Sequence, residues 1–356
     1  MSMQNRWLLA LSVLGWATAG STAARGADTA PSAAPLAFLR QSVPSRGLVR
    51  LEILGTAEWA FGKGAQRSRS FRLVCTYLRD GQRLDVQTTR YEGGRPISAW
   101  RSIIDGFYIS YPVPPRGSTA LSGMYAAEGG RFVGAAIPSG WGGFEGYAAG
   151  DYLSLSQILQ SAAQVQVGQD QVDGSACVLL QVDSPDHGRY QAWLDPAMNY
   201  LPRKLLVQKT VGHFMGNLRL SQWTRISPSG SRGTVALTAV SYTMDQTTFE
   251  RIGDRWFPLT CRVMRIQSFA DGNSETTVMN CRRTQLVLDP DLTALGAFRP
   301  QLRQGAPLAN QVDRYLPYQW KDGAAVPLVD ARVLAQMEQT AATLKQESTH
   351  SGGAGR

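Results

Sequence analysis

Alternating hydrophobic and polar positions run through most of the chain and predict a protein built mainly of β-strands. Near the start, Val49, Leu51 and Ile53 alternate with polar neighbours. This period of two gives a strand one buried and one solvent-exposed face. The pattern returns in later runs that are separated by Gly-containing turns such as Asp80-Gly81 and Asp105-Gly106. We count about eleven strands on this basis.

The stretch Arg189–Gln208 shows the pattern most clearly. Tyr190, Ala192 and Leu194 alternate with Gln191, Trp193 and Asp195. Asp195-Pro196 then opens a turn, because proline fixes its φ near the turn value and aspartate can bond the backbone two residues on. A second strand follows from Lys204. The sequence therefore predicts a β-hairpin with a polar tip.

Helical spacing is rare. Ser154–Gln164 has a capping box at Ser154 and Gln157 followed by an apolar stripe, and Leu36–Val43 and Asp330–Lys345 are two further predicted helices. Residues 112–150 and 289–323 are predicted to be long irregular segments. Many antiparallel hairpins and few helices favour one large curved antiparallel sheet. We expect an incomplete β-barrel of about eleven strands, with a few α-helices covering its open end.

The first 27 residues have the features of a secretory signal peptide. Arg6 precedes an apolar run from Trp7 to Trp16, and Ala17-Thr18-Ala19 or Ser21-Thr22-Ala23 fits the cleavage rule. No cysteine lies near either site, so we expect a periplasmic or secreted protein without a lipid anchor. The predicted division is signal peptide and linker in 1–27, one half-barrel domain in 28–325, and a helix with a disordered tail in 326–356.

The formal charge of +9 comes mostly from arginine, since only five of the 36 basic residues are lysine. Nucleic acid is not an expected partner of an exported chain, and the basic residues are scattered. The anionic lipid head groups of a membrane surface, or envelope polymers, are better candidates. The alternative is that arginine simply replaces lysine throughout.

Four cysteines in an exported chain permit disulfides. A three-residue hairpin loop at Ala270-Asp271-Gly272 would place Cys261 directly opposite Cys281, and a two-residue loop would put the two sulfurs on opposite faces. We predict a disulfide between Cys261 and Cys281. Cys75 and Cys177 are either bonded or small buried apolar residues.

Catalytic and metal-binding motifs are missing from the sequence. The three histidines, His187, His213 and His350, fall in turns or in the tail, and there is no HExxH, CxxC, G-x-S-x-G or phosphate-binding loop. Ser139 lies in a Gly-rich turn with no histidine nearby in the sequence. The sequence therefore predicts a protein that is not an enzyme and has no catalytic residue, metal or cofactor.

Large apolar side chains on the strands are abundant and suit a curled sheet with a broad apolar inner surface. Ordinary core packing is the alternative role for each of them. If the interior is not filled by side chains or helices, the cavity would bind an apolar ligand. The predicted ligand-binding residues are Trp59, Phe71, Trp100, Phe107, Trp193, Trp223 and Met244.

Several segments resemble, in order, the LolA/LolB-like (lipoprotein-carrier-like) family of bacterial envelope proteins. The similarity covers about residues 36–320 and is strongest after 170. Its motifs are signatures of turns and strands. The matching stretches are V-D-G at Val172–Gly174, W-L-D-P at Trp193–Pro196 with L-P at Leu201-Pro202, G-D-R-W-F-P at Gly253–Pro258, and N…F-R-P…G from Asn280 through Phe298–Pro300 to Gly305.

This resemblance implies a half-barrel with a hydrophobic cavity capped by helices, and a non-enzymatic carrier of lipidated ligands. The chain differs from shuttle carriers in its length, its Gly-rich 112–150 segment and its C-terminal helix. We therefore expect a binding protein for a lipid, an acyl chain or a lipoprotein. The alternative is an envelope sensor or interaction module of the same fold with a filled interior and a partner docked on residues 112–150. A hydrolase would need converging histidine or carboxylate groups.

Overall fold

The computed structural model describes residues 46–60, 66–115, 117–138, 140–162, 164–216, 218–226, 234–310 and 317–328, and six positions between 330 and 340. The predicted signal peptide and the predicted helix Leu36–Val43 lie outside these residues. Of the predicted helix Asp330–Lys345, the described residues 332, 333, 336, 339 and 340 are helical.

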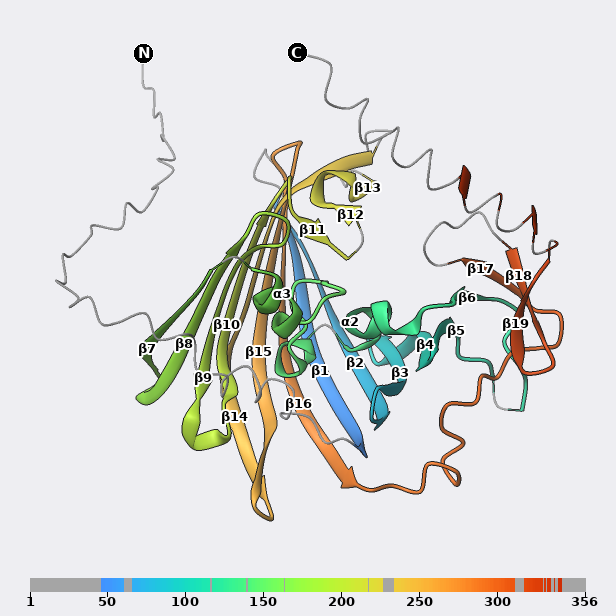
Figure 1. Cartoon of the computed structure of the whole chain (residues 1–356), viewed down its shortest axis with the longest axis horizontal. Helices are drawn as coiled ribbons and strands as arrows, with labels where there is room; N and C mark the ends of the chain where they lie inside the picture. Colours follow the sequence, from blue (N-terminus) through green and yellow to red (C-terminus); the bar gives the residue numbers. More distant parts are fainter. Residues whose placement is uncertain are drawn as a thin grey trace, which may run out of the picture.

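One large open sheet of 17 strands organises the fold (Figure 1). Neighbouring strands are antiparallel except for the parallel pair β6 and β17. In spatial order the strands are β7 (Val165–Val172), β8 (Ser175–Ser184), β9 (Gly188–Asp195), β10 (Leu201–Thr210), β14 (Thr234–Ile252), β15 (Arg255–Phe269), β16 (Ser274–Leu288), β1 (Arg46–Ala60), β2 (Gln66–Asp80), β3 (Arg83–Glu92), β4 (Arg95–Asp105), β5 (Phe107–Pro112), β6 (Gly123–Ala126), β17 (Pro307–Asn310), β18 (Pro317–Lys321) and β19 (Ala324–Pro327).

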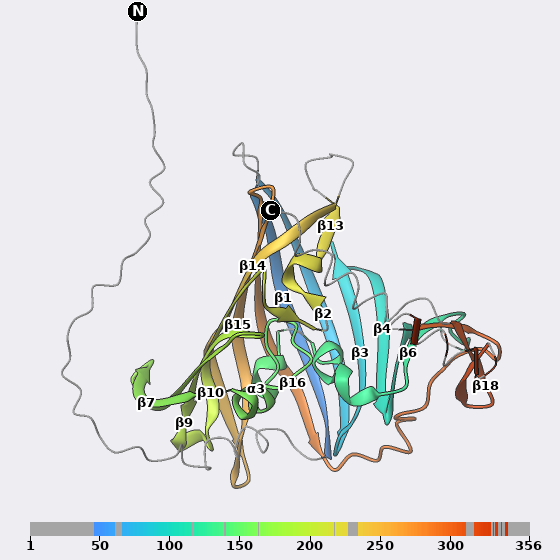
Figure 2. The ribbon, with the colours of Figure 1, turned by 45° about the horizontal axis from the view of Figure 1, so that its top comes forward.

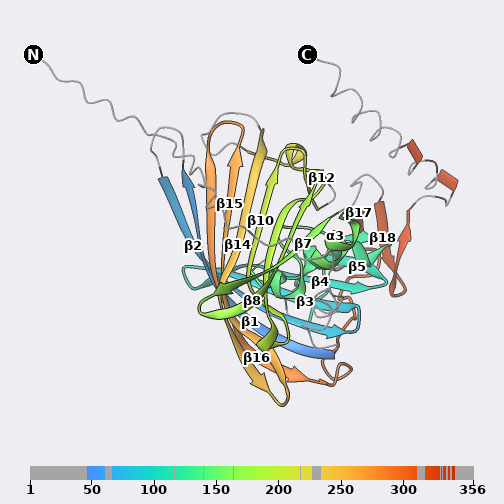
Figure 3. The ribbon, with the colours of Figure 1, turned by 60° about the vertical axis from the view of Figure 1, so that its left-hand side comes forward.

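Three further strands are short, and of these only β13 belongs to the main sheet. β13 (Thr224–Ile226) pairs with the start of β14. β11 (Phe214–Met215) and β12 (Leu218–Arg219) form a separate small hairpin, followed by the 3₁₀ turn η4 (Leu220–Gln222). Figure 3 shows the bend of the main sheet from another side.

The predicted incomplete barrel is confirmed as a mainly β, curved and open sheet. The expected count of about eleven strands is too low. The additional strands include β6, β17 and β18, which lie in the two segments that the sequence predicts to be irregular. These strands have four or five residues each, so they are too short to show a clear alternation of polar and apolar residues.

The predicted hairpin at Arg189–Gln208 is present as β9 and β10. Its tip is the 3₁₀ turn η3 (Pro196–Met198), and the Asp195 carboxylate accepts a hydrogen bond from the Ala197 amide at 2.8 Å. The same carboxylate pairs with the Arg203 guanidinium at 2.5 Å. The turn residue named from the sequence therefore also fixes the start of the return strand.

A helical segment covers the middle of one face of the sheet (Figures 1 and 2). We call it the inner segment (residues 129–161) and the face it covers the inner face. Its buried side chains form one core with the strands. The segment consists of η1 (Gly129–Phe132), α2 (Val133–Ala136), η2 (Gly142–Glu145) and α3 (Leu155–Ser161), and its buried residues include Phe132, Ile137, Trp141, Phe144, Leu155 and Ile158.

This packing corrects two expectations. The apolar cavity expected inside the curved sheet is not found over the middle of the inner face, because the chain's own aromatic and aliphatic side chains fill this space. Most described residues of 129–150 are buried, and the short helical elements η1, α2 and η2 replace much of the predicted irregular segment. The capping box that starts α3 is as predicted, since Ser154 accepts from the Gln157 amide and Gln157 accepts from the Ser154 amide.

A second core lies on the outer face of β4 and β5. There Ile103, Ile109 and Tyr111 pack with Phe298 and Leu308. The buried Arg101–Asp85 ion pair, at 2.6 Å, sits at its edge, and Asp85 also accepts from the Phe298 amide at 2.8 Å. The chain after β16 is held to the sheet in this way.

Two glycines offer a matched test of how tightly the inner segment is seated. A Cβ added at Gly134 in α2 would lie 2.1 Å from the backbone oxygen of Asp151, whereas one added at Gly168 in β7 would meet nothing within 4 Å. We expect Gly134→Ala to lower the free energy of unfolding by about 1–3 kcal/mol through overpacking. Gly168→Ala should change it by less than ~0.5 kcal/mol. Urea unfolding of both variants measures these changes. Equal changes in the free energy of unfolding would contradict tight packing of the inner segment against the sheet.

Candidate ligand-binding site

The inner face also carries a row of side chains fixed by strand register, and this row begins at Tyr242 beneath the inner segment. Tyr242 on β14 lies opposite Arg265 on β15, and Arg265 lies opposite Thr277 on β16. Thr277 in turn lies opposite Ala57 on β1. Because cross-strand partners point to the same side of a sheet, the long Arg265 side chain stands on the inner face beside two small residues.

Arg265 is partly buried and has no ion-pair or hydrogen-bond partner among the described residues. Its Nε is buried and makes no hydrogen bond, and no other residue that the structure describes forms an ion pair with it. Burial lowers the pKa of the Arg265 guanidinium, and the nearby Glu275 and Tyr242 partly oppose this shift. The group stays charged at any physiological pH because arginine starts from a very high pKa.

Tyr242 adds an unused polar atom beside Arg265. Its phenol oxygen is buried and has no hydrogen-bond partner among the described residues. Burial raises the pKa of Tyr242 well above its ordinary value, so the phenol keeps its proton. The phenol lies near Gly143 of the inner segment, and the charge of Arg265 on the neighbouring strand acts on it.

Glu275, the nearest carboxylate, is already neutralised. Its Oε2 pairs with Arg225 Nη1 at 2.6 Å and accepts from Trp59 Nε1 at 3.0 Å. The Arg225 guanidinium also lies over the Phe269 ring, 3.5 Å from its centroid. The positive charge of Arg265 is thus left over at this end of the sheet.

Two of the predicted ligand-binding residues, Trp59 on β1 and Phe71 on β2, also lie on the inner face, separated from Arg265 by β16. Phe71 on β2 lies over Gly55 and packs against the main core, and Trp59 is half-buried at the end of β1. An unpaired guanidinium can take a carboxylate or phosphate in a bidentate way, and aromatic rings on the same face of the sheet can contact an apolar chain. Nothing in this arrangement provides a nucleophile with an adjacent base.

The other five predicted residues are scattered. Met244 is fully buried beneath the inner segment, Trp100 is on the inner face of β4 but 43% exposed, and Trp223 donates to the Met215 carbonyl at 2.8 Å. Phe107 and Trp193 point to the outer face, where Trp193 donates to Asp170 at 2.8 Å and Phe107 packs on Tyr125. Ligand contact by Trp59 and Phe71 stays a prediction of this site.

The sequence analysis missed Arg265 and Tyr242. A usable signal was present, because Arg265 falls in the same alternating set as Cys261, Val263 and Phe269, which are apolar and buried. A charge on the apolar side of a strand is unusual, and it indicates either an ion pair or a site. Tyr242 gave no such signal, since a tyrosine in a core strand is ordinary.

Cys261 and Cys281 lie directly opposite each other, as the three-residue loop predicts. Gly272 has φ of +78°, and the Phe269 amide donates to the Asn273 carbonyl at 3.0 Å. Counting back in steps of two from this bonded pair makes Cys261 and Cys281 a hydrogen-bonded pair as well, with Cα atoms about 5.5 Å apart. Both sulfurs are free thiols that donate to the Gly140 carbonyl at 3.3 Å.

The disulfide therefore stays a prediction with its geometry supported, because ~5.5 Å is within the range that a disulfide spans. We expect air-oxidised protein to contain one bond, Cys261–Cys281, with Cys75 and Cys177 free, since these two are buried in separate strands. Burial raises the pKa of the Cys75 thiol to about 11, which makes it a poor nucleophile. Alkylation before and after reduction, read by mass spectrometry, measures this. Four alkylated thiols without reductant would contradict it.

Two further observations bear on the chemistry of the described residues. None of the helices in the described ranges is long and apolar enough to cross a membrane. Among the same residues, no group of three or more His, Cys, Asp and Glu side chains could hold a metal ion.

Comparison with known proteins gives a fold-level likeness. No protein-family model and no curated protein matches the chain. Among solved structures, a LolA superfamily protein from Nitrosomonas europaea is similar at 13% identity, covering 74% of this chain and 95% of that one, with a TM-score of 0.34. A DUF1329 family protein from Desulfovibrio piger is similar at 14% identity with the same coverages and a TM-score of 0.35.

Proposed function

We propose that the chain is an exported, non-enzymatic binding or carrier protein for an amphipathic ligand with an anionic head group, such as a fatty acid or the acyl part of a lipidated partner. The observation that carries this proposal is Arg265, whose guanidinium has no described partner on an inner face lined with aromatic residues. Leaving a partly buried charge unpaired costs stability, so a ligand that supplies the counter-charge explains its presence.

The packed interior limits where the apolar part of such a ligand can lie. The middle of the inner face is filled by the inner segment, with Phe144 and Trp141 deep in the core. A chain bound at Arg265 would extend along Phe71 and Trp59, where the side chains are half-buried. Burial of apolar surface contributes about 25 cal/mol per Å², so even this partial contact would stabilise binding.

Delipidated protein titrated with a long-chain fatty acid tests the proposal. We expect binding of one ligand per chain by calorimetry, and much weaker binding of the alcohol of the same chain length, because only the carboxylate pairs with Arg265. Native mass spectrometry of freshly purified protein provides a second readout through co-purified lipid. Equal binding of acid and alcohol would remove Arg265 from the site, and no binding of either would reject the function.

The filled middle of the inner face favours a second candidate, an envelope sensor or interaction module that transports nothing. In this case the inner segment is a permanent part of the core. The partner surface expected on residues 112–150 would be reduced to its exposed start, around residues 117–122. A pull-down from an envelope extract that recovers a protein partner, together with absence of fatty-acid binding, would support this candidate over the first.

A further inference from the structure

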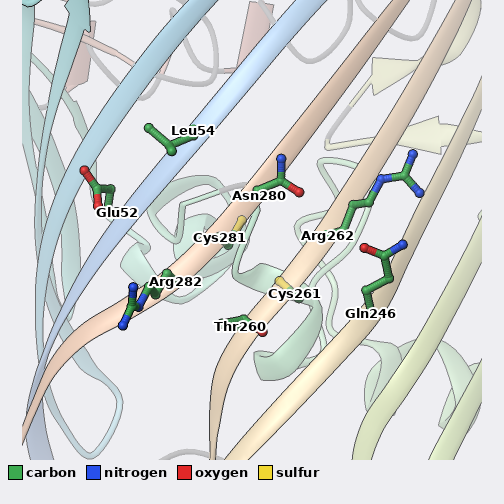
Figure 4. A pocket seen from close by; sticks show the side chains of 9 residues that line it. All are labelled: Glu52, Leu54, Gln246, Thr260, Cys261, Arg262, Asn280, Cys281 and Arg282. Atoms are coloured by element: carbon green, nitrogen blue, oxygen red, sulfur yellow. The ribbon is translucent and has the colours of Figure 1, made fainter. Parts of the chain in front are cut away.

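A pocket opens on the outer face of the sheet, on the opposite side from Arg265. It has a volume of about 310 Å³, at the lower end of the range for small-molecule sites. Figure 4 shows its side chains, which come from β1, β14, β15 and β16. They are Glu52, Leu54, Gln246, Thr260, Cys261, Arg262, Asn280, Cys281 and Arg282.

Strand register explains how the polar side chains meet. Arg262 lies opposite Asn280, and Thr260 lies opposite Arg282. The even-numbered residues of β15 and β16 therefore point outward together, while Cys261 and Cys281 between them turn their thiols inward to Gly140. The two cysteines form the floor, and the two arginines stand on diagonal positions around it (Figure 4).

The charges in the pocket are unevenly balanced. Glu52 is engaged by Arg72 at 2.5 Å, outside the pocket lining. Arg262 has only a long contact of 3.8 Å to Asp245. Arg282 has no ion pair or hydrogen bond with any residue that the structure describes. One arginine without an ion pair and one weakly held arginine therefore line the same pocket, with their guanidinium groups toward opposite sides of it (Figure 4).

A β-bulge delivers an amide to the same place. Gln246 and Thr247 together lie across from Cys261, because the pairing of β14 with β15 shifts between Asp245 and Thr248. Gln246 has φ of +49°, a left-handed conformation that side chains other than glycine rarely adopt. Thr247 anchors the bulge by donating to the Arg203 carbonyl at 3.1 Å. Bulges of this kind re-aim a side chain and are common beside binding sites.

We propose that this outer pocket binds the carboxylate or phosphate group of a small anionic ligand. Arg282 and Arg262 supply the charge, because guanidinium groups pair with such oxygens in a bidentate way. The amides of Asn280 and Gln246 supply further donors, and neither has a described hydrogen-bond partner. The exposed Leu54 offers an apolar contact for the rest of the ligand. The site stands independently of the inner-face proposal, since different residues on the opposite face carry it.

The anionic group can come from a soluble molecule or from a lipid head group, and three probes separate these sources. The full chain is titrated with glucuronate, with inorganic phosphate and with phosphatidylglycerol vesicles, using phosphatidylcholine vesicles as the neutral reference. Binding of a soluble probe identifies a small-molecule site, and binding of anionic vesicles alone identifies a head-group site. Both outcomes support the proposal when the variants below respond as expected.

The test variants are Arg282→Gln and Arg262→Gln, with Arg299→Gln as the matched control. Arg299 is exposed, lies outside the pocket and loses the same charge on substitution. We expect at least ten-fold weaker binding of the recognised probe for Arg282→Gln, a smaller loss for Arg262→Gln, and no change for Arg299→Gln. Equal losses in Arg282→Gln and Arg299→Gln would show a general charge effect and overturn the proposal, as would no binding of any probe. Circular dichroism checks that each variant is folded.

Discussion

Arg265→Met is expected to weaken fatty-acid binding and, at the same time, to stabilise the ligand-free protein. A hydrogen bond to a charged group contributes about 1.5–3 kcal/mol, so its loss should reduce affinity roughly 10- to 150-fold. Without ligand, the buried Nε of Arg265 has no hydrogen-bond acceptor among the described residues. Replacing it with an apolar side chain of similar length should raise the free energy of unfolding by about 1 kcal/mol. Calorimetry and urea unfolding measure the two effects.

Arg251→Met is the control, since Arg251 is an exposed arginine on β14. This variant should leave both affinity and stability within experimental error of the parent chain. Opposite signs of the two effects at position 265 are what a binding role requires. If Arg265→Met destabilised the free protein by several kcal/mol, Arg265 would be a structural residue and the site would lose its main support.

Lys209→Met is expected to lower the free energy of unfolding by about 3–5 kcal/mol, since it leaves an unpaired carboxylate in the core. The Lys209 side chain is 0% exposed and that of Asp151 is 3% exposed, and their charged atoms are 2.8 Å apart. Lys209 also donates to the His187 and Phe214 carbonyls at 2.6 and 2.9 Å. Burial raises the pKa of Asp151 and lowers the pKa of Lys209, and the charge of each partner opposes the shift of the other.

The double variant Asp151→Leu/Lys209→Met separates charge from packing. Removing both partners leaves no unpaired charge, so we expect it to be about 2 kcal/mol or more above Lys209→Met in the free energy of unfolding. The Tyr190 phenol donates to Asp151 and accepts from Lys209 at 2.7 Å. Tyr190→Phe should therefore cost only about 1 kcal/mol, because the ion pair itself stays. Urea unfolding of the three variants gives these values. A double variant as unstable as Lys209→Met would mean that packing, and not the buried pair, holds residue 151 to β10.

The strands and the hairpins could be predicted because each depends on residues close in sequence. The turn at Asp195-Pro196 and the loop with Gly272 at its left-handed position are local signals, and both are present. The position of residues 129–161 could not be predicted in this way. Their glycines resemble those of a surface loop. In the fold, however, a Cβ at Gly140 would collide with Cys281, and one at Gly143 would collide with Met244.

The candidate site shows the same limit. Aromatic residues were the visible signal, and the strand period alone did not say which face each of them would occupy; Trp193 and Phe107 point outward. Arg265 matters because Thr277 and Ala57 beside it are small and Glu275 is held by Arg225. These relations join residues from four strands, and they are visible only once the sheet register is known.

The contact between the two central thiols and Gly140 links the oxidation state of the protein to its interior. Both protons that this carbonyl accepts belong to sulfur atoms. Joining Cys261 to Cys281 would remove both protons in one step and leave the carbonyl without donors from the sheet below. Preparations made with and without reductant would then differ in how firmly residues near 140 are held, so ligand titrations should be run on each form separately.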